Sequence, residues 1–193
     1  MFKKIGLILF ALIGISTYAG NDIEGVKVGA NTPVKELKTI SGKKLNLVDN
    51  TKNYVLVFYR GSWCPYCMKQ LDSIQSEVVP KLDKKTTLVA ISVDKDSVAK
   101  KMKKKRDYSF EVVSDPKASS LMAFKIANKL DDELVEKYKS AYKIDVEGDS
   151  GEKHHIVAHP GVFIVKNGKI VFADVHTNYK ERTENSVILK ELK

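Results

Sequence analysis

Two cysteines separated by two residues are the feature of this sequence with the clearest chemical potential. Cys64 and Cys67 are the only cysteines among 193 residues, and they stand in the segment Trp63-Cys64-Pro65-Tyr66-Cys67. Two thiols at this spacing can close a small disulfide ring and open it again, which is the basis of thiol–disulfide exchange. Two cysteines are too few for a disulfide scaffold. The pair therefore predicts redox chemistry.

The residues on either side of the cysteines predict a strand-to-helix turn. A continuous apolar run over residues 54–59 is typical of a buried strand, and apolar residues recur at intervals of three and four after Pro65, as in an amphipathic helix. A thiol at a helix N-terminus feels the positive end of the peptide dipoles, which favours the thiolate. We therefore expect Cys64 to be the exposed attacking thiol and Cys67 the more buried resolving thiol. Arg60 is close enough in sequence to help stabilise the thiolate, although a surface ion pair is an alternative role for it.

The remaining chain predicts parallel strand-helix-strand units followed by an antiparallel hairpin. Further strands are expected over residues 45–48, 87–93 and 110–113, helices over 97–106, 117–126, 131–142 and 183–192, and a polar loop over 147–153. The dipeptide Asn167-Gly168 lies between two apolar runs and predicts a type I′ turn. Pro80 is expected to kink or stop the helix that begins at Pro65. This order indicates an α/β sandwich around a mixed central sheet, with helices on both faces.

The first nineteen residues have the pattern of a secretory signal peptide. Two lysines precede an apolar run over residues 5–15, and small residues lead to Ala19. A run of about eleven residues is too short to span a bilayer of ~30 Å at ~1.5 Å per residue. We expect cleavage after Ala19, a single domain over residues 20–193 and a periplasmic location, with an uncleaved membrane anchor as the alternative.

The formal charge of +9 does not by itself identify a partner. Six of the seven residues over Lys100–Arg106 are basic, which is a pattern of nucleic-acid or anionic-lipid binding. An exported protein does not meet nucleic acid by default. We therefore interpret this stretch as a solvated helix face and expect no nucleic-acid partner.

Residues 58–67 resemble the active-site stretch of the thioredoxin superfamily. The resemblance is strongest to its peroxiredoxin-like branch, the alkyl hydroperoxide reductase/thiol-specific antioxidant (AhpC/TSA) family, with a Cys-Pro-Tyr-Cys motif. Residues 88–94, 110–116, 159–164 and 179–182 follow in the same order as in that branch, so the similarity covers roughly residues 31–193. It implies a thioredoxin-like three-layer sandwich.

The resemblance also implies roles for individual residues. Pro160 would be the cis-proline of a loop that faces the cysteines and offers backbone to a substrate, and His159 would lie beside the site. Trp63, with Pro65 and Tyr66, would shape the substrate groove. Tyr179 and Arg182 match the family's tail, but no chemistry is assigned to them.

The expected activity is that of an exported thiol–disulfide oxidoreductase acting on protein or small-thiol substrates. Peroxiredoxins show the pattern Pro-x-x-x-Thr/Ser-x-x-Cys. When Cys67 is aligned with that cysteine, Arg60 and Cys64 stand where the proline and the hydroxyl residue belong. The alternative is a thiol-dependent peroxidase acting on hydroperoxides, in which one cysteine is oxidised to sulfenic acid and the other condenses with it. Neither reading needs a cofactor, and both need a partner that donates or accepts electrons.

A third reading is a structural zinc module. Two cysteines and two histidines make a tetrahedral zinc site. The candidate histidines are His154, His155, His159 and His176. This reading predicts bound metal and no disulfide cycling.

Overall fold

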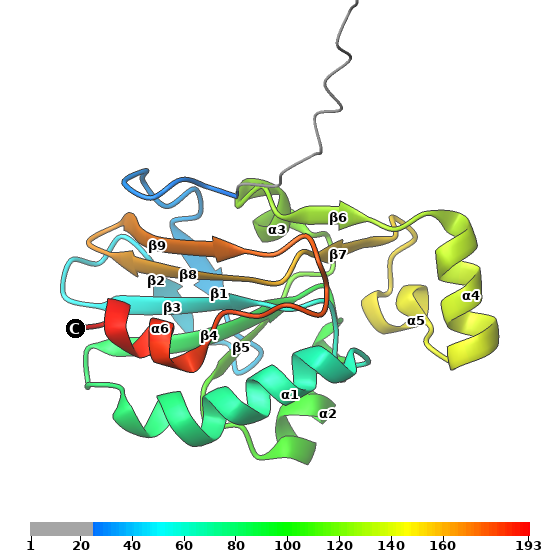
Figure 1. Cartoon of the computed structure of the whole chain (residues 1–193), viewed down its shortest axis with the longest axis horizontal. Helices are drawn as coiled ribbons and strands as arrows, with labels where there is room; N and C mark the ends of the chain where they lie inside the picture. Colours follow the sequence, from blue (N-terminus) through cyan, green and yellow to red (C-terminus); the bar gives the residue numbers. More distant parts are fainter. Residues whose placement is uncertain (1–24) are drawn as a thin grey trace, which may run out of the picture.

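A mixed five-stranded sheet forms the centre of the computed structural model, which describes residues 25–193 (Figure 1). The strand order is β5-β4-β3-β8-β9. Strands β3, β4 and β5 are parallel, whereas β8 is antiparallel to β3 and β9 is antiparallel to β8. The bounds are β3 Asn53–Phe58, β4 Thr86–Ser92, β5 Glu111–Ser114, β8 Gly161–Lys166 and β9 Lys169–Val175. The apolar runs in the sequence therefore predicted the central strands correctly.

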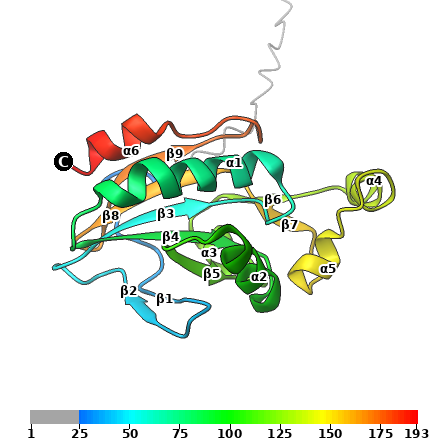
Figure 2. The same ribbon diagram turned by 90° about the horizontal axis from the view of Figure 1, so that it is seen from below.

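The alternating side chains of β3 divide the interior into two cores. Val55 and Val57 face the core that contains both cysteines, whereas Leu56 and Phe58 face the other core. Helices α1 (Pro65–Ser73), α2 (Asp96–Arg106) and α6 (Asn185–Glu191) supply side chains to the cysteine-containing core. The second core is completed by α3 (Ser119–Ala123), the pair β1 (Glu36–Lys38) and β2 (Lys44–Asn46), and the pair β6 (Ala127–Lys129) and β7 (Ile156–Ala158). Figure 2 shows α1 and α6 on one side of the sheet and the β1–β2 pair on the other.

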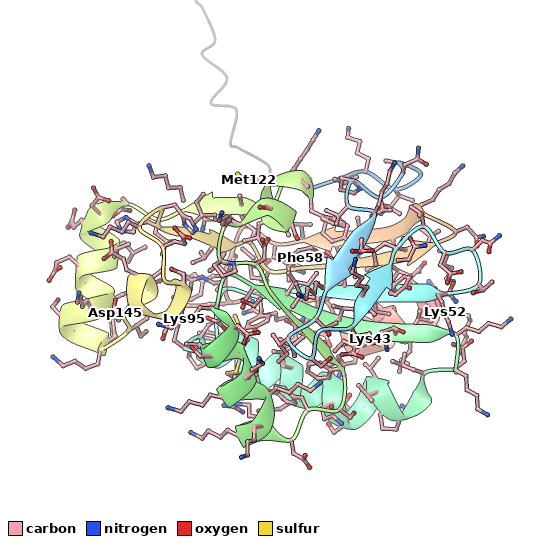
Figure 3. The ribbon with its side chains drawn as sticks, turned by 180° about the vertical axis from the view of Figure 1, so that it is seen from behind. Lys43, Lys52, Phe58, Lys95, Met122 and Asp145 are labelled. Carbon is pink, nitrogen blue, oxygen red and sulfur yellow. The ribbon has the colours of Figure 1, made fainter. Side chains whose placement is uncertain are left out.

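Three aromatic rings lie at the centre of the second core. The ring centroid of Phe124 lies 5.0 Å from that of Phe58 and 4.9 Å from that of Phe163. Offset and edge-on contacts of this kind stabilise a core beyond the area that they bury. Figure 3 shows Phe58 inside the fold and Met122 on its outer surface.

The structure confirms two sequence predictions, one about the β8–β9 turn and one about the end of the helix near Pro80. Asn167 and Gly168 have φ values of 52° and 72°, as the type I′ turn between β8 and β9 requires. The helix after Pro65 leaves α geometry at Ser73 and continues as a π-helical turn over Ile74–Val78 and a 3₁₀ turn over Val79–Lys81. Pro80 lies in that last turn, where its missing N–H and its ring prevent continuation of the α-helix.

Other elements differ from the prediction. The helix expected over residues 117–126 is reduced to α3, and the chain then enters β6, which pairs with β7 about thirty residues later in the sequence. The polar loop expected over residues 147–153 contains a short helix, α5 (Val146–Ser150). The side chain of Asp145 caps α5 by accepting a hydrogen bond from the Gly148 N–H at 2.9 Å. The local sequence pattern therefore missed the long-range pairing of β6 with β7 and the Asp145 cap of α5.

Helix α4 (Asp132–Tyr142) and helix α5 form an extension between β6 and β7 (Figure 1). Helix α4 begins after Asp131, whose side chain accepts a hydrogen bond from the Leu134 N–H at 2.7 Å. It has no fully buried residue. His155 joins the two helices, because its Nδ1 lies 2.9 Å from Asp132 Oδ1 and its Nε2 lies 2.8 Å from Glu147 Oε1.

The basic stretch forms most of α2, an amphipathic helix whose buried side carries Met102. Lys100 pairs with Asp96 at 2.6 Å, and Arg106 pairs with Asp72 at 2.6 Å. The expected signal peptide, residues 1–19, lies outside the described residues. Within residues 25–193, no helix is long and apolar enough to cross a membrane.

Candidate active site

The cysteine pair lies at the edge of the sheet where three strands end or begin. Phe58, the last residue of β3, pairs with Ile91 near the end of β4 and with Gly161 at the start of β8. The segments that leave this edge therefore meet, because the carboxyl ends of parallel strands share one side of a sheet. They bring Cys64, Asp94 and Pro160 to the same region.

Cys64 occupies the N-cap position of α1, where the sequence predicted it. Its backbone is extended, Pro65 follows at the first helical position, and the Cys67 N–H donates to Cys64 Sγ at 3.4 Å. A proline is well tolerated there because its missing N–H would have no partner within the helix. The thiol of Cys64 thus receives both a backbone hydrogen bond and the positive end of the helix dipole.

Both cysteines are free thiols, and both are buried. Cys64 is 1% exposed and Cys67 is 0% exposed. The expectation that the Cys64 sulfur is exposed is wrong for this conformation. Arg182, near the C-terminus, covers the sulfurs: its Nη2 lies 3.2 Å from Cys67 Sγ and 3.9 Å from Cys64 Sγ. Arg182 belongs to the C-terminal connection, residues 176–184, which joins β9 to α6.

The pKa values of the two thiols are shifted in opposite directions. A hydrogen bond from the Cys67 side chain lowers the pKa of Cys64 to about 6; the Cys67 N–H and the charges of Arg60 and Arg182 act in the same direction, and burial opposes them. Burial raises the pKa of Cys67 well above its ordinary value, and the hydrogen bond and negative charge of Cys64 add to that rise. Cys64 is therefore the thiolate near neutral pH, and Cys67 keeps its proton.

Arg60 is a buried residue that connects three parts of the site. It is 4% exposed, and its Nη2 donates a hydrogen bond to the Tyr138 hydroxyl of α4 at 2.8 Å. Its guanidinium carbon lies 4.9 Å from the ring centroid of Trp63 and 4.9 Å from that of Tyr179. Arg60 is thus not part of a surface ion pair, and its charge reaches Cys64. Next to it, Gly61 is needed because a Cβ there would clash with the Trp63 indole.

The structure adds a buried carboxyl group that the sequence analysis did not single out. Asp94 is 1% exposed; its Oδ2 accepts hydrogen bonds from the Ser62 N–H at 2.8 Å and from the Tyr59 hydroxyl at 3.4 Å. Its Oδ1 has no hydrogen-bond partner. Burial raises the pKa of Asp94 to about 6. Its position directly after a strand parallel to β3 was a signal that it lies near the cysteines.

His159 and Pro160 lie at the same edge, but Pro160 differs from the expectation. No peptide bond within residues 25–193 is cis, so the predicted cis-proline is wrong. The His159 N–H donates to Ile126 O at 2.8 Å, and Pro160 O accepts from the His176 N–H at 2.9 Å. These bonds hold the connection between β7 and β8, and they occupy backbone groups that were expected to face a substrate. His159 is 7% exposed, and burial lowers its pKa.

The histidines do not gather around the cysteines as a zinc site requires. His154 Nε2 lies 2.6 Å from Pro116 O, His155 bridges two carboxylates, and His176 Nε2 lies 3.2 Å from Asp174 Oδ2. Nowhere in residues 25–193 do three histidine, cysteine or acidic side chains converge on a position for a metal ion. The structure therefore gives no support to the zinc reading.

The sequence comparison identifies the family. The AhpC/TSA family profile matches residues 28–173. The chain belongs to the AhpC/TSA family. Over 113 residues it is 30% identical to the thiol-disulfide oxidoreductase ResA of Bacillus cereus, an alignment that covers 56% of this chain and 65% of ResA. It is also 26% identical to the thioredoxin-like protein YneN of Bacillus subtilis over 162 residues, or 77% of this chain and 87% of YneN.

Solved structures with a similar fold include peroxiredoxins. A PrxQ cysteine-to-serine variant from Xylella fastidiosa has a TM-score of 0.63 at 16% identity, covering 86% of this chain and 94% of that one. Reduced Prx3 from Vibrio vulnificus, in complex with hydrogen peroxide, has a TM-score of 0.66 at 16% identity, with coverages of 87% and 99%. These likenesses confirm the thioredoxin-like α/β sandwich that the sequence predicted.

Proposed function

We propose that this AhpC/TSA-family protein is an exported thiol–disulfide oxidoreductase that uses its Cys-Pro-Tyr-Cys motif. One observation supports this most directly: the pKa of Cys64 is lowered to about 6 while the pKa of Cys67 is raised. An attacking thiol must be deprotonated and a resolving thiol must wait in its protonated form, and the opposite directions of the two pKa shifts divide the roles in this way.

The exchange follows in two balanced steps. The Cys64 thiolate attacks one sulfur of a substrate disulfide, a mixed disulfide forms, and the second substrate sulfur leaves as a thiolate that takes up a proton. Cys67 then loses its proton and attacks Cys64 Sγ, which releases the first substrate sulfur as a thiol. The substrate gains two electrons, and the protein ends with a Cys64–Cys67 disulfide that a dithiol partner must reduce. Run in reverse, the same steps oxidise a dithiol substrate.

Access to Cys64 requires the C-terminal connection to move. Arg182 contacts both sulfurs, so it must withdraw before a substrate sulfur can approach Cys64. Tyr66 is 41% exposed and Tyr179 is 42% exposed, with ring centroids 5.9 Å apart, so this aromatic pair lies at the surface beside the thiols. We propose that substrate contacts come from Trp63, Pro65 and Tyr66, and that the side chains of His159 and Pro160 join them once the C-terminal connection has moved, because the His159 N–H and the Pro160 carbonyl are already hydrogen-bonded.

A thiol peroxidase is the second candidate. Arg182 Nη2 lies 3.2 Å from the sulfur of Cys67, and Cys67 stands where the peroxiredoxin pattern has its reactive cysteine. A guanidinium at that distance favours a thiolate and an anionic transition state. The raised pKa of Cys67 argues against this candidate.

The proposed location is the periplasm. It rests on the signal-peptide pattern of residues 1–19, with cleavage after Ala19 and a mature domain over residues 20–193. Intact-mass measurement of the protein recovered from the periplasm of a Gram-negative host tests it. A mature chain that begins at Gly20 supports export, and a full-length chain retained in the cytoplasm contradicts it.

The test of the activity uses Trp63, the single tryptophan, as a fluorescent reporter beside Cys64. Reduced protein is mixed in a stopped-flow instrument with hydrogen peroxide or with insulin as a protein disulfide, for wild type, Cys64→Ser and Cys67→Ser. The oxidoreductase reading expects slow oxidation by peroxide and rapid exchange with the disulfide. Cys64→Ser should abolish that exchange, and Cys67→Ser should trap a mixed disulfide. Rapid oxidation by stoichiometric peroxide that only one substitution abolishes would instead establish the peroxidase.

A further inference from the structure

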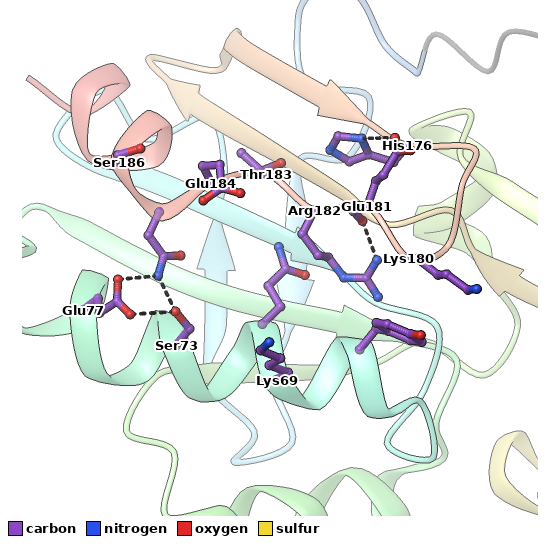
Figure 4. A pocket seen from close by; sticks show the side chains of 13 residues that line it. Lys69, Ser73, Glu77, His176, Lys180, Glu181, Arg182, Thr183, Glu184 and Ser186 are labelled. Carbon is purple, nitrogen blue, oxygen red and sulfur yellow. Dashed lines mark hydrogen bonds and ion pairs between the residues drawn. The ribbon is translucent and has the colours of Figure 1, made fainter.

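A cavity of about 770 Å³ lies beside the thiols, between α1 and the chain that joins β9 to α6 (Figure 4). Tyr66, Lys69 and Ser73 of α1 line one wall, and Lys180 and Arg182 of the C-terminal connection line the other. Pockets that hold small ligands have volumes of about 300–1,000 Å³. The cavity is therefore large enough for a ligand bigger than hydrogen peroxide.

Arg182 links this cavity to the sulfurs. Its Nη2 contacts both cysteines while the residue itself lines the cavity. Its Nε is buried and has no hydrogen-bond partner, and the same is true of Thr183 Oγ1, which also lines the cavity. Thr183 is only 4% exposed. Buried polar atoms are normally paired, and the displacement of Arg182 that substrate access requires would free these two atoms for hydrogen bonds to a bound polar ligand.

The cavity is lined by charges of both signs. Lys180 and Arg182 lie at its thiol end together with Glu181, Lys69 and Glu184 lie toward its middle, and Glu77 lies at the opposite end (Figure 4). Hydrogen bonds from Asn185 and Ser73 lower the pKa of Glu77, so this carboxylate stays ionised. Glu181 also has partners, Asn178 Nδ2 at 2.8 Å and His176 at 3.6 Å, and it lies at the same end as Lys180 and Arg182, so Glu77 is the carboxylate at the far end of the cavity (Figure 4). A ligand that carries a carboxylate near its sulfur and an ammonium group farther away matches this arrangement.

The distance between charges of opposite sign sets the size of that ligand. Lys69 and Glu77 stand eight positions apart along the same helical segment, which at ~1.5 Å per residue is roughly 12 Å. Three to four extended residues at ~3.3 Å each cover this distance. The match is to a compound of tripeptide size.

We propose that this cavity selects short, zwitterionic peptide thiols and their disulfides as substrates. The inference rests on the proposed function, because the exchange at Cys64 is the one described above. Lys69 and Lys180 bind the carboxylate of the substrate, Glu77 binds its ammonium group, and the Thr183 hydroxyl and Arg182 Nε–H bind polar groups between them. The substrate reaches the sulfurs by displacing Arg182 from them.

The test compares three disulfides against the reduced protein. Oxidised glutathione is the charged peptide probe, bis(2-hydroxyethyl) disulfide is a neutral probe with the same bond, and insulin reports exchange with a protein. We expect oxidised glutathione to react at least tenfold faster than the neutral disulfide. Equal rates would overturn the substrate class and leave the exchange activity standing, as would a reaction with insulin alone. No reaction with any of the three would defeat the proposed function, and this inference with it.

Substitutions inside and outside the cavity test whether its charged residues cause the preference for oxidised glutathione. Lys69→Gln and Glu77→Gln should each lower kcat/KM for oxidised glutathione about three- to tenfold and leave the rate with the neutral disulfide unchanged. Lys137→Gln and Glu136→Gln make the same charge changes on exposed positions of α4, outside the cavity, and should change neither rate. Glu77 also holds Asn185, so Lys69→Gln keeps the test valid if Glu77→Gln loosens α6. Unchanged glutathione kinetics in folded Lys69→Gln would contradict the proposal.

Discussion

Cys64 and Cys67 are the same side chain in two different environments. Cys64 caps a helix and receives hydrogen bonds, which favour its anion, whereas Cys67 is buried against that anion. The difference in pKa therefore depends on each residue's partner and not on the spacing of the motif alone. The hydrogen bond from the Cys67 side chain is the largest cause of the lowered pKa of Cys64.

Removing that bond should be measurable. In Cys67→Ala, we expect the pKa of Cys64 to rise from about 6 toward the ~8.5 of a free thiol. Thiolate absorbance at 240 nm, followed from pH 4 to pH 10, gives the midpoint without requiring a reagent to reach the buried sulfur. Cys67→Ser is the control, because its hydroxyl can still donate a hydrogen bond. An unchanged midpoint in Cys67→Ala would show that the helix N-terminus and the two arginines are sufficient.

Asp94 contributes a pH dependence of stability. Because burial raises its pKa to about 6, above the ~3.9 of an unfolded chain, the folded protein holds a proton that the unfolded chain releases between these pH values. The free energy of unfolding should therefore fall as pH rises from about 4 to about 6, by about 3 kcal/mol at most. Asp94→Asn keeps an oxygen for the Ser62 N–H and has no such titration. Urea unfolding at several pH values should show this fall in wild type and a smaller one in the variant, and equal slopes would contradict the assignment.

At the scale of elements, the side chain of His155 bridges α4 and α5. Hydrogen bonds with Glu147 and Asp132 raise the pKa of His155. The charged form therefore stabilises the extension at low pH, and this contribution is lost as pH rises through the raised pKa of the folded state. Because α4 carries Tyr138, which binds Arg60, loosening the extension also reaches the active site.

Hydrogen exchange checks this prediction. After correction for the intrinsic rate, protection of α4 amides should fall about two- to fivefold between pH 6 and pH 8, since exposed pairs of this kind contribute at most ~1 kcal/mol. His155→Gln should show the lower protection at both pH values. If protection is the same across the pH range in wild type, the histidine does not hold the two helices together.

At the scale of the whole molecule, the central sheet separates the cysteine pair from the core on its opposite face. Phe124 lies in the core on the face opposite the cysteines and is 0% exposed. Phe124→Ala should lower the free energy of unfolding by about 3–5 kcal/mol. It should leave the thiolate titration of Cys64 unchanged, because Phe124 packs on Phe58 and Phe163 on the face of the sheet opposite the cysteines. Leu71→Ala is the matched control, since Leu71 packs in the core that holds the cysteines and its loss should change both quantities. A titration shift in Phe124→Ala would show that the two cores are coupled through the sheet.

Local patterns were sufficient for the central strands and for the position of the cysteine pair. The central strands, the Asn167-Gly168 turn, the end of the helix near Pro80 and the N-cap position of Cys64 all depend on residues within one or two turns of the chain. Hydrophobic periodicity and backbone preferences act over that range, so the sequence by itself determined them.

Contacts between distant segments were decided only by the tertiary structure. Arg182 meets Cys67 across 115 positions, and Arg60 meets Tyr138 across 78. No periodicity marks such partners, because their meeting depends on the summed lengths and packing of every element between them. For the same reason, the motif alone predicted an exposed Cys64, whereas the cis-Pro160 was implied only by the family resemblance. The folded chain instead covers the thiols with its own C-terminal connection and runs through a trans bond from β7 into β8.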